Sequence, residues 1–336
     1  MTRTGIDVGG TKVLGVALDA AGEVVAEIRR PTPRAVDVGD RSIDELLTVL
    51  AEVSAELGST VALGVGVPGL VTRAGVLRAA PNLDGVADVD VAGRLADLTG
   101  LDVYVDNDAT CATVAEWQLG AGARTSDMML ITLGTGIGGG LVAGGALQRG
   151  VNGFAGEFGH MVVHPEGPRC PCGRRGCWER YASGSGLAML AREAAVARRL
   201  EHVVELAGGD PQAVRGEHVQ DAARAGDPEA LAVIDDFARW VALGLSNLTN
   251  AVDPEMFVLG GGLAAGADLY LEPIEAWFRE LLYQPDLRPM PRIEFARWGS
   301  LAGAVGAALL PEVEGDVVVP PVQRRDTAGQ GTAPGG

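Results

Sequence analysis

The sequence predicts an α/β protein of two similar halves that face each other across a cleft. Its 336 residues are enough for two domains. Residues 6–18 and 131–147 each place a glycine-rich turn between two apolar strands. Because halves that open alike indicate duplication, we expect two α/β units of related architecture.

Composition restricts the class of partner. The chain has 44 acidic and 27 basic residues, a formal net charge of −17, and 47% hydrophobic residues. The apolar fraction excludes a wholly disordered chain. The negative charge argues against nucleic acid or an anionic membrane as the main partner. An anionic substrate would have to be held by local backbone amides or a metal that overcome this field.

The cysteines indicate a metal site. Three of the four lie within residues 170–177. This clustering favours a metal and a reducing compartment, because a disulfide framework would spread its cysteines through a shorter secreted chain. No basic segment followed by an apolar run is present at the N-terminus. We therefore expect no secretion signal and a cytoplasmic protein.

The first half is expected to begin with strands and continue with alternating helices and strands. Residues 4–8, 13–18 and 24–30 are apolar runs separated by glycine-containing turns, which predicts three short strands. The elements predicted next are a helix at 42–57, a strand at 61–67, a helix at 91–98, a strand at 103–105 and a helix at 108–119. We place the end of the N-terminal unit at residue 118.

The uncharged stretch 128–148 is long enough, at 21 residues, to cross a bilayer. Seven of these positions are glycine, three of them consecutive. Glycine marks turns between short buried strands, so we expect a strand–turn–strand unit here.

The second half is expected to be more helical. Asp227 and Pro228 form an N-cap and a first helical position, and apolar residues then recur at steps of three and four up to Val252. A buried strand at 256–259 and a helix of small residues at 301–310 follow. We assign 119–300 to the C-terminal unit, join 301–310 to the N-terminal unit, and expect a disordered tail at 311–336.

Three glycine turns predict a nucleotide in the cleft, because each follows an apolar strand and they are spread over both halves. Glycines let the backbone turn tightly and approach a phosphate with its N–H groups, and an aspartate at a strand end could hold hydrated Mg²⁺. For the first turn, a plain hairpin is the alternative. The predicted residues are Asp7, Gly9, Gly10, Thr11, Lys12, Gly134, Thr135, Gly136, Gly138, Gly260, Gly261 and Gly262.

Asp106, Asn107 and Asp108 stand between a predicted strand and a predicted helix. A carboxylate at a strand end can be a general base, and an adjacent asparagine can bind hydroxyl groups. The alternative is an N-cap for the following helix. Both can hold, because one residue can cap the helix while its neighbour takes part in chemistry.

The segment 156–179 contains the most specific pattern. His160, Cys170, Cys172 and Cys177 are one imidazole and three thiols, which is the donor set of structural zinc sites. Glycines between the cysteines allow the turns that bring thiolates together. His164 is a competing histidine, and Cys111 is expected to be a core thiol.

The motifs together resemble the ROK family, named for repressors, open reading frames and sugar kinases. In order they are Asp-x-Gly-Gly-Thr-Lys, Asn-Asp, Leu-Gly-Thr-Gly-x-Gly-Gly-Gly, Glu-x-Gly-His and Cys-x-Cys-Gly-x-x-Gly-Cys-x-Glu. The resemblance covers about residues 4–310 and is greatest to bacterial ATP-dependent glucokinases. It implies an actin-like (ribonuclease H-like) two-domain sugar kinase fold, with sugar and ATP in the cleft.

The resemblance also implies roles for single residues. Asp108 matches the catalytic base. His160 matches a zinc ligand as well as a sugar contact, which selects it over His164; the cysteines match the other zinc ligands. The positions that match sugar contacts are Asn82, Asn107, Glu157, His160 and Glu179. The implied cofactors are structural Zn²⁺ and the Mg²⁺ that accompanies ATP.

We predict that the chain transfers the γ-phosphate of ATP to the 6-hydroxyl of glucose. We also expect it to form a homodimer or homotetramer. Other hypotheses are a kinase for N-acetylmannosamine or fructose, a kinase that uses polyphosphate, and a non-catalytic sugar-sensing regulator. A repressor would carry a helix-turn-helix before the sugar domain, but the first predicted strand starts at about residue 4.

Overall fold

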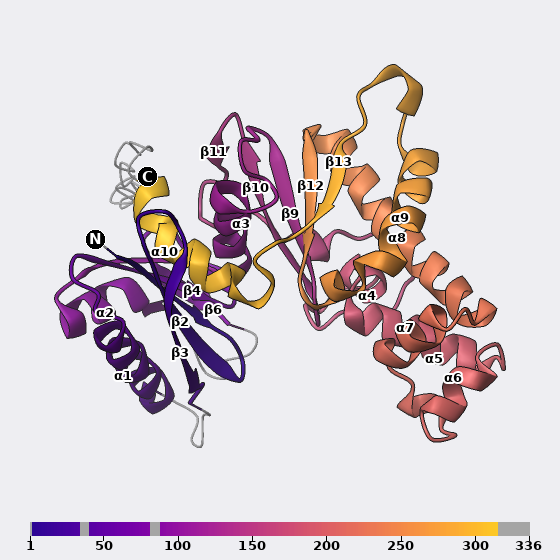
Figure 1. The fold of residues 1–336 in the computed structure, drawn as a ribbon, viewed down its shortest axis with the longest axis horizontal. Helices are drawn as coiled ribbons and strands as arrows, with labels where there is room; N and C mark the ends of the chain where they lie inside the picture. Colours follow the sequence, from indigo (N-terminus) through magenta and orange to yellow (C-terminus); the bar gives the residue numbers. More distant parts are fainter. Residues whose placement is uncertain (1, 34–39, 81–87, 315–336) are drawn as a thin grey trace, which may run out of the picture.

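A computed structural model describes residues 2–33, 40–80 and 88–314 of the chain. The first half forms a five-stranded sheet in the order β3-β2-β1-β4-β8 (Figure 1). Its strands are β1 (Arg3–Val8), β2 (Lys12–Leu18), β3 (Val24–Pro31), β4 (Ala62–Val67) and β8 (Asp102–Asn107). β1 pairs antiparallel with β2 and parallel with β4, and β8 continues the parallel side. The carboxyl ends of β1, β4 and β8 therefore meet at one edge.

The second half repeats this pattern, in the order β11-β10-β9-β12-β13. Its strands are β9 (Met128–Leu133), β10 (Ile137–Ala143), β11 (Ala146–Leu147), β12 (Met256–Gly260) and β13 (Arg292–Phe295). β9 pairs antiparallel with β10 and parallel with β12, as β1 does with β2 and β4. The duplication predicted from the two glycine-rich turns is confirmed at the level of strand order and direction.

Helices cover both sheets. α1 (Asp40–Glu56) and α2 (Val91–Thr99) pack on one face of the first sheet and share its core. The second sheet is followed by a helical group that packs beside it (Figure 1). The helices of this group are α4 (Glu179–Ala182), α5 (Gly184–Val196), α6 (Glu201–Leu206), α7 (Gly216–Arg224), α8 (Pro228–Val252) and α9 (Ala267–Leu281).

Short elements complete the chain. A small sheet contains β5 (Leu70–Val71), β6 (Val76–Ala79) and β7 (Val89–Asp90). The 3₁₀ helices are η1 (Phe158–His160), η2 (Pro211–Ala213), η3 (Gly262–Gly266), η4 (Pro285–Leu287) and η5 (Gly299–Leu301). Of these, η1, η2, η3 and η5 contribute residues to the cavities described below.

Two helices, α3 (Asp108–Leu119) and α10 (Ala302–Glu314), lie between the two sheets (Figure 1). They share one buried cluster with side chains of β2, β9, β10 and β12. The two helices are in close contact at Gly306 of α10, where an added Cβ would lie only 1.6 Å from the Cys111 carbonyl oxygen of α3. A methyl group there would force the helices apart, so the small residues of α10 are required by this packing.

The helix boundaries follow local sequence signals. The Asp227 side chain accepts hydrogen bonds from the N–H groups of Glu229 and Ala230, and Pro228 occupies the first turn of α8. α8 ends at Val252, and its C-cap, Asp253, adopts the left-handed conformation with a φ of 52°. The cap satisfies N–H groups that have no partner within the helix, and proline in the first turn loses no helical hydrogen bond. The predicted start of this helix is confirmed.

Some expectations need correction or lie outside the described residues. α10 runs to Glu314 and includes Pro311. The prediction that a disordered tail starts at residue 311 is therefore wrong for residues 311–314. Asn82 and residues 315–336 are not among the described residues. The uncharged stretch at 128–148 forms β9, β10 and β11, and no helix in the described ranges is long and apolar enough to span a membrane.

Candidate functional site

A polar cavity of about 330 Å³, which we call cavity A, opens between the two halves. The first half contributes residues 68–71 after β4 and the start of α3 after β8. The second half contributes the turn between β9 and β10, the loop at 153–157, His160 and Glu179. The predicted site residues that line it are Asn107, Asp108, Gly134, Thr135, Gly136, Gly138, Glu157, His160 and Glu179.

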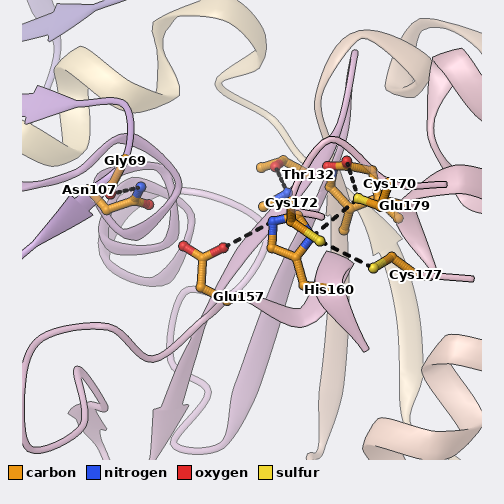
Figure 2. A network of polar contacts seen from close by, with 11 residues as sticks. Gly69, Asn107, Thr132, Glu157, His160, Cys170, Cys172, Cys177 and Glu179 are labelled. Carbon is orange, nitrogen blue, oxygen red and sulfur yellow. Dashed lines mark hydrogen bonds and ion pairs between the residues drawn. The ribbon is translucent and has the colours of Figure 1, made fainter. Parts of the chain in front are cut away.

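Asn107 holds one wall of cavity A in place. Its side-chain oxygen accepts hydrogen bonds from the N–H groups of Ala109 and Thr110 at 2.9 and 3.1 Å, which caps α3. Its amide nitrogen donates to the Gly69 carbonyl at 3.1 Å (Figure 2). The capping alternative considered for this motif is therefore confirmed for Asn107, and it leaves the neighbouring Asp108 side chain facing the cavities.

Asp108 lies where cavity A meets a second cavity, because it lines both. Burial raises the pKa of this carboxyl above its ordinary value, and the hydrogen bond from the Ala109 N–H opposes the shift. The charge of Glu157 raises the pKa further. A carboxylate made more basic by burial, at the start of a helix and at the junction of two cavities, has the properties of a general base.

The second cavity, cavity B, has a volume of about 230 Å³ and contains a second carboxylate. Burial, and then the charge of Asp108, raise the pKa of Asp7 to about 7, while Lys12 opposes the shift. Gly303 of α10 contacts this carboxylate so closely that an added Cβ would lie 2.6 Å from its Oδ1. Gly260 and Gly261 line the same cavity, which joins the first and third glycine motifs.

A third cavity, cavity C, is the largest of the three, at about 1060 Å³, and lies on the other side of the second glycine turn. Gly134 and Thr135 line it together with Gly262 of the third turn. Backbone and side-chain bonds fix the shared turn, because the Gly184 N–H donates to the Gly134 carbonyl and the Ser185 hydroxyl to the Thr135 carbonyl, both at 2.8 Å. Arg180, Arg192 and Arg215 add positive charge to its lining, and Glu193 and Glu217 add negative charge.

The first glycine turn is only partly brought to the cavities. Gly9, Gly10, Thr11 and Lys12 connect β1 to β2, and the Gly9 N–H donates to the Lys12 carbonyl at 2.8 Å. None of these four residues lines cavities A, B or C. Lys12 nevertheless acts on cavity B through its charge, since it lowers the pKa of Asp7. A phosphate role for this turn therefore stays a prediction.

His160, Cys170, Cys172 and Cys177 form the one cluster of metal-ligand type found in the described ranges, with one ligand atom from each within 4.8 Å of the others. The His160 Nδ1 lies 3.8 Å from the Cys170 Sγ, and the Cys172 and Cys177 sulfurs are 3.6 Å apart (Figure 2). Zinc–sulfur bonds of about 2.3 Å in a tetrahedron place two sulfurs about 3.8 Å apart. The donor set and its spacing therefore fit a tetrahedral metal ion.

The same segment that carries this cluster also lines cavity A. The Glu179 Oε1 lies 3.9 Å from the Cys170 Sγ, and its Oε2 accepts a hydrogen bond from the Ile137 N–H at 3.0 Å. The second ring nitrogen of His160, Nε2, lies 3.8 Å from the Glu157 carboxylate (Figure 2). An ion held by the cluster would therefore fix His160 and the loop to Glu179, and with them one wall of cavity A.

The other residues of this segment have structural roles. The His164 Nδ1 lies 3.0 Å from the Tyr181 hydroxyl, and His164 is not a member of the cluster. Trp178 is fully buried, and its indole N–H donates a hydrogen bond to the Trp240 carbonyl. The Tyr181 ring stacks on the Trp240 ring, with the ring centroids 4.0 Å apart. These aromatic contacts anchor the metal-binding segment to α8.

Some residues at the site were not predicted, among them the arginines of cavity C. Thr132 lines cavities A and B and accepts a hydrogen bond from the Gly138 N–H. Glu116 is fully buried and its carboxylate accepts from the N–H groups of Ala121, Arg297 and Trp298, which ties α3 to both connections between the halves. Its sequence signal was an acidic residue within an apolar helix. Arg149, which is treated below, had no local signal.

Comparison with known proteins gives a consistent result. The model of the ROK family matches residues 3–313. A glucokinase of Streptomyces coelicolor is 37% identical over 309 residues, which cover 90% of this chain and 95% of the relative. Solved structures of ROK family kinases also resemble this chain. A ROK family glucokinase of Streptomyces griseus, solved in complex with glucose and AMPPNP, superposes with a TM-score of 0.79 at 35% identity, covering 92% of this chain and 99% of that one.

A ROK hexokinase of Thermus thermophilus gives a TM-score of 0.76 at 36% identity, covering 94% of this chain and all of the other. Three observations indicate the same fold: the strand order of the two sheets, the match of the family model along nearly the whole sequence, and these structural likenesses. The predicted actin-like sugar kinase fold is confirmed, and the chain belongs to the ROK family.

Proposed function

We propose that this chain is an ATP-dependent glucokinase that transfers the γ-phosphate of ATP to the 6-hydroxyl of glucose. The observation that carries this proposal is the position of Asp108 in the lining of both cavity A and cavity B. A hydroxyl group bound in one cavity and a phosphoryl group bound in the other would meet at this carboxylate. The glucokinases reported above as relatives support the choice of substrates.

Cavity A is the proposed glucose site. Its polar side chains, Asn107, Glu157, His160 and Glu179, offer both donors and acceptors to a molecule that carries hydroxyl groups. A cavity of about 330 Å³ is within the range of small-ligand sites. Asn82 was predicted to add a sugar contact and lies outside the described residues.

Cavities B and C are the proposed donor site. The glycines that line cavity B allow backbone N–H groups to approach phosphate oxygens, and the arginines of cavity C counter the negative charge of the chain. The nucleoside would lie in cavity C beside Gly134 and Gly262, with the phosphates directed towards Asp108. Asp7 would hold the hydrated Mg²⁺ that accompanies ATP and neutralises phosphate charge.

The proposed chemistry depends on position and proton transfer. Asp108 would accept the proton of the glucose 6-hydroxyl as the oxygen attacks the γ-phosphorus in line. The cluster of His160 and three cysteines would hold a structural Zn²⁺, because all four ligands come from the protein and no position is left for substrate. The metal would orient the His160 ring, so that its other nitrogen can bind the sugar.

A coupled assay tests this function directly. Purified protein is supplied with glucose, fructose, mannose or N-acetylmannosamine, and with ATP or polyphosphate as donor. The proposal predicts that kcat/KM is highest for the pair of glucose and ATP. A preference for an N-acetylated sugar or for polyphosphate would correct the substrate, whereas binding of glucose without turnover on any donor would favour the sugar-sensing regulator.

The raised pKa of Asp7 predicts a pH dependence of donor binding. Below pH 7 this carboxyl is mostly protonated and cannot attract a hydrated cation, because its pKa is about 7. The affinity for Mg²⁺ with AMPPNP should therefore rise as the pH increases through this value. In the Asp7→Asn variant, which cannot titrate, that part of the pH dependence should disappear.

Calorimetry about one unit on either side of pH 7 measures this effect without turnover. The binding of AMPPNP without Mg²⁺ is the control, since it should change much less with pH. An unchanged pH dependence in Asp7→Asn would contradict the role assigned to this carboxyl.

A further inference from the structure

A buried ion pair joins the two halves beside the proposed site. The Arg149 Nε donates to the Asp106 Oδ2 at 2.5 Å, and the two side chains are 7% and 6% exposed. Asp106 belongs to β8 of the first sheet, and Arg149 follows β11 of the second. The pair therefore connects the edge strand of the first sheet to the residues that follow the edge strand of the second.

On the side of the first half, the pair is connected to the residues that precede α3. The Asp106 Oδ1 accepts a hydrogen bond from the Asn107 N–H at 2.8 Å. The same carboxylate is thus bonded to Arg149 through one oxygen and to the backbone of Asn107 through the other. Asp108, the proposed base, is the next residue in the chain, so a shift of Asp106 would move the start of α3.

On the side of the second half, Arg149 begins the loop that lines cavity A. Its carbonyl oxygen accepts a hydrogen bond from the Ala155 N–H at 3.1 Å. Residues 153–157 of this loop line the cavity and end at Glu157. Gly153 also packs on the first half, because an added Cβ would lie 2.5 Å from the Val71 carbonyl oxygen. One residue thus contacts the base-bearing segment with its side chain and the sugar-facing loop with its backbone.

Stability alone is a poor reason for such a pair. Two charges that leave water lose hydration, and this loss often equals or exceeds what their mutual attraction returns. Burial raises the pKa of Asp106, and the Arg149 charge opposes that shift, so the arginine favours the ionised form. Two apolar side chains of similar size would fill the space, whereas a charged pair fixes the distance and direction between the two segments.

We propose that Arg149 is a positioning residue, which sets the distance between the Asp108 carboxylate and the sugar held by the loop at 153–157. This inference rests on the proposed kinase function. Arg149 does not line cavity A, so it would act through Asp106 and Ala155 without touching the sugar. A displacement of about 1 Å between reacting groups can cost about 10²-fold in rate.

The test uses kinetics and thermal melting of the full chain. Arg149→Met removes the charge and keeps the length of the side chain, and Arg149→Lys keeps the charge but not the planar geometry of the guanidinium. The double variant with Asp106→Asn and Arg149→Met removes both charges of this pair. The matched control is Arg30→Met. Arg30 lies on β3, the outer strand of the first sheet, and its exposed ion pair with Glu56 of α1 is removed by this change.

The expected result for Arg149→Met is a fall in kcat of about 10²-fold, a raised KM for glucose and an unchanged KM for ATP. Arg149→Lys should recover part of kcat. In the double variant the melting temperature should recover in part, because neither charge of this pair is left buried without the other, but kcat should stay low. Arg30→Met should match the unmodified chain in all of these quantities.

Recovery of kcat together with stability in the double variant would overturn the proposal, because the pair would then be structural only. A folded Arg149→Met variant with normal kcat would do the same. The failure of the proposed function gives a different result, since the unmodified chain would then phosphorylate no sugar of the panel, which would overturn both the function and the role of Arg149 in it.

Discussion

Replacing Asp108 with asparagine is expected to lower kcat by about 10²–10⁴-fold, the usual contribution of a general base. The substitution keeps the size of the side chain but removes its ability to accept the hydroxyl proton. α3 should remain intact, because the Asn107 side chain caps it by accepting hydrogen bonds from two N–H groups, and the asparagine oxygen at 108 can still accept from the Ala109 N–H. Turnover of glucose with saturating ATP measures the effect.

Glucose binding and stability are the controls for this variant. Calorimetry should detect glucose binding of nearly normal affinity, and the melting temperature should change little. The pKa of Asp7 should fall, because the charge of Asp108 is one of the causes that raise it. A variant that keeps more than about a tenth of the normal turnover would remove Asp108 from the role of base.

The second large effect is expected from loss of the metal-binding cluster. Cys172→Ser removes the one exposed thiol of the four-residue set, so the ion should be lost with little disturbance of the core. We expect a sharp rise in the KM for glucose, because the cluster positions His160 and the segment that carries Glu179. Donor binding should change much less, since cavity B contains no residue of this segment.

Metal analysis and separate titrations with glucose and AMPPNP measure this prediction. Cys111→Ala is the matched control, because that buried thiol lies in α3 outside the cluster and its loss should leave the metal content unchanged. Normal glucose affinity in a variant shown to be free of metal would contradict the structural role of the ion. An equal loss of affinity for glucose and AMPPNP would indicate general unfolding instead.

Much of the fold could be predicted because its signals are local. The apolar face of α8, with Asp227 and Pro228 at its start, follows from a spacing of three and four residues. The duplication was visible in two glycine turns between apolar strands. The metal ligands could be selected because a histidine and three close cysteines form a donor set within one short segment.

The rest of the site depends on contacts between residues that are far apart in the chain. The pair of Asp106 and Arg149 spans 43 positions, and Glu116 reaches backbone groups 181 and 182 positions away. No local pattern announces such contacts. Composition also could not foresee that α10 would continue through Pro311, where packing between the sheets outweighs the low helix propensity of proline.

A structure of the chain with glucose and AMPPNP would show whether sugar and donor meet at Asp108, between cavities A and B. We expect the glucose 6-hydroxyl within about 2.6–3.2 Å of the Asp108 carboxylate, in line with the γ-phosphorus. Glucose should contact Glu157, His160 and Glu179 in cavity A, with the phosphates in cavity B. A sugar bound with its 6-hydroxyl away from Asp108, or phosphates that do not enter cavity B, would contradict it.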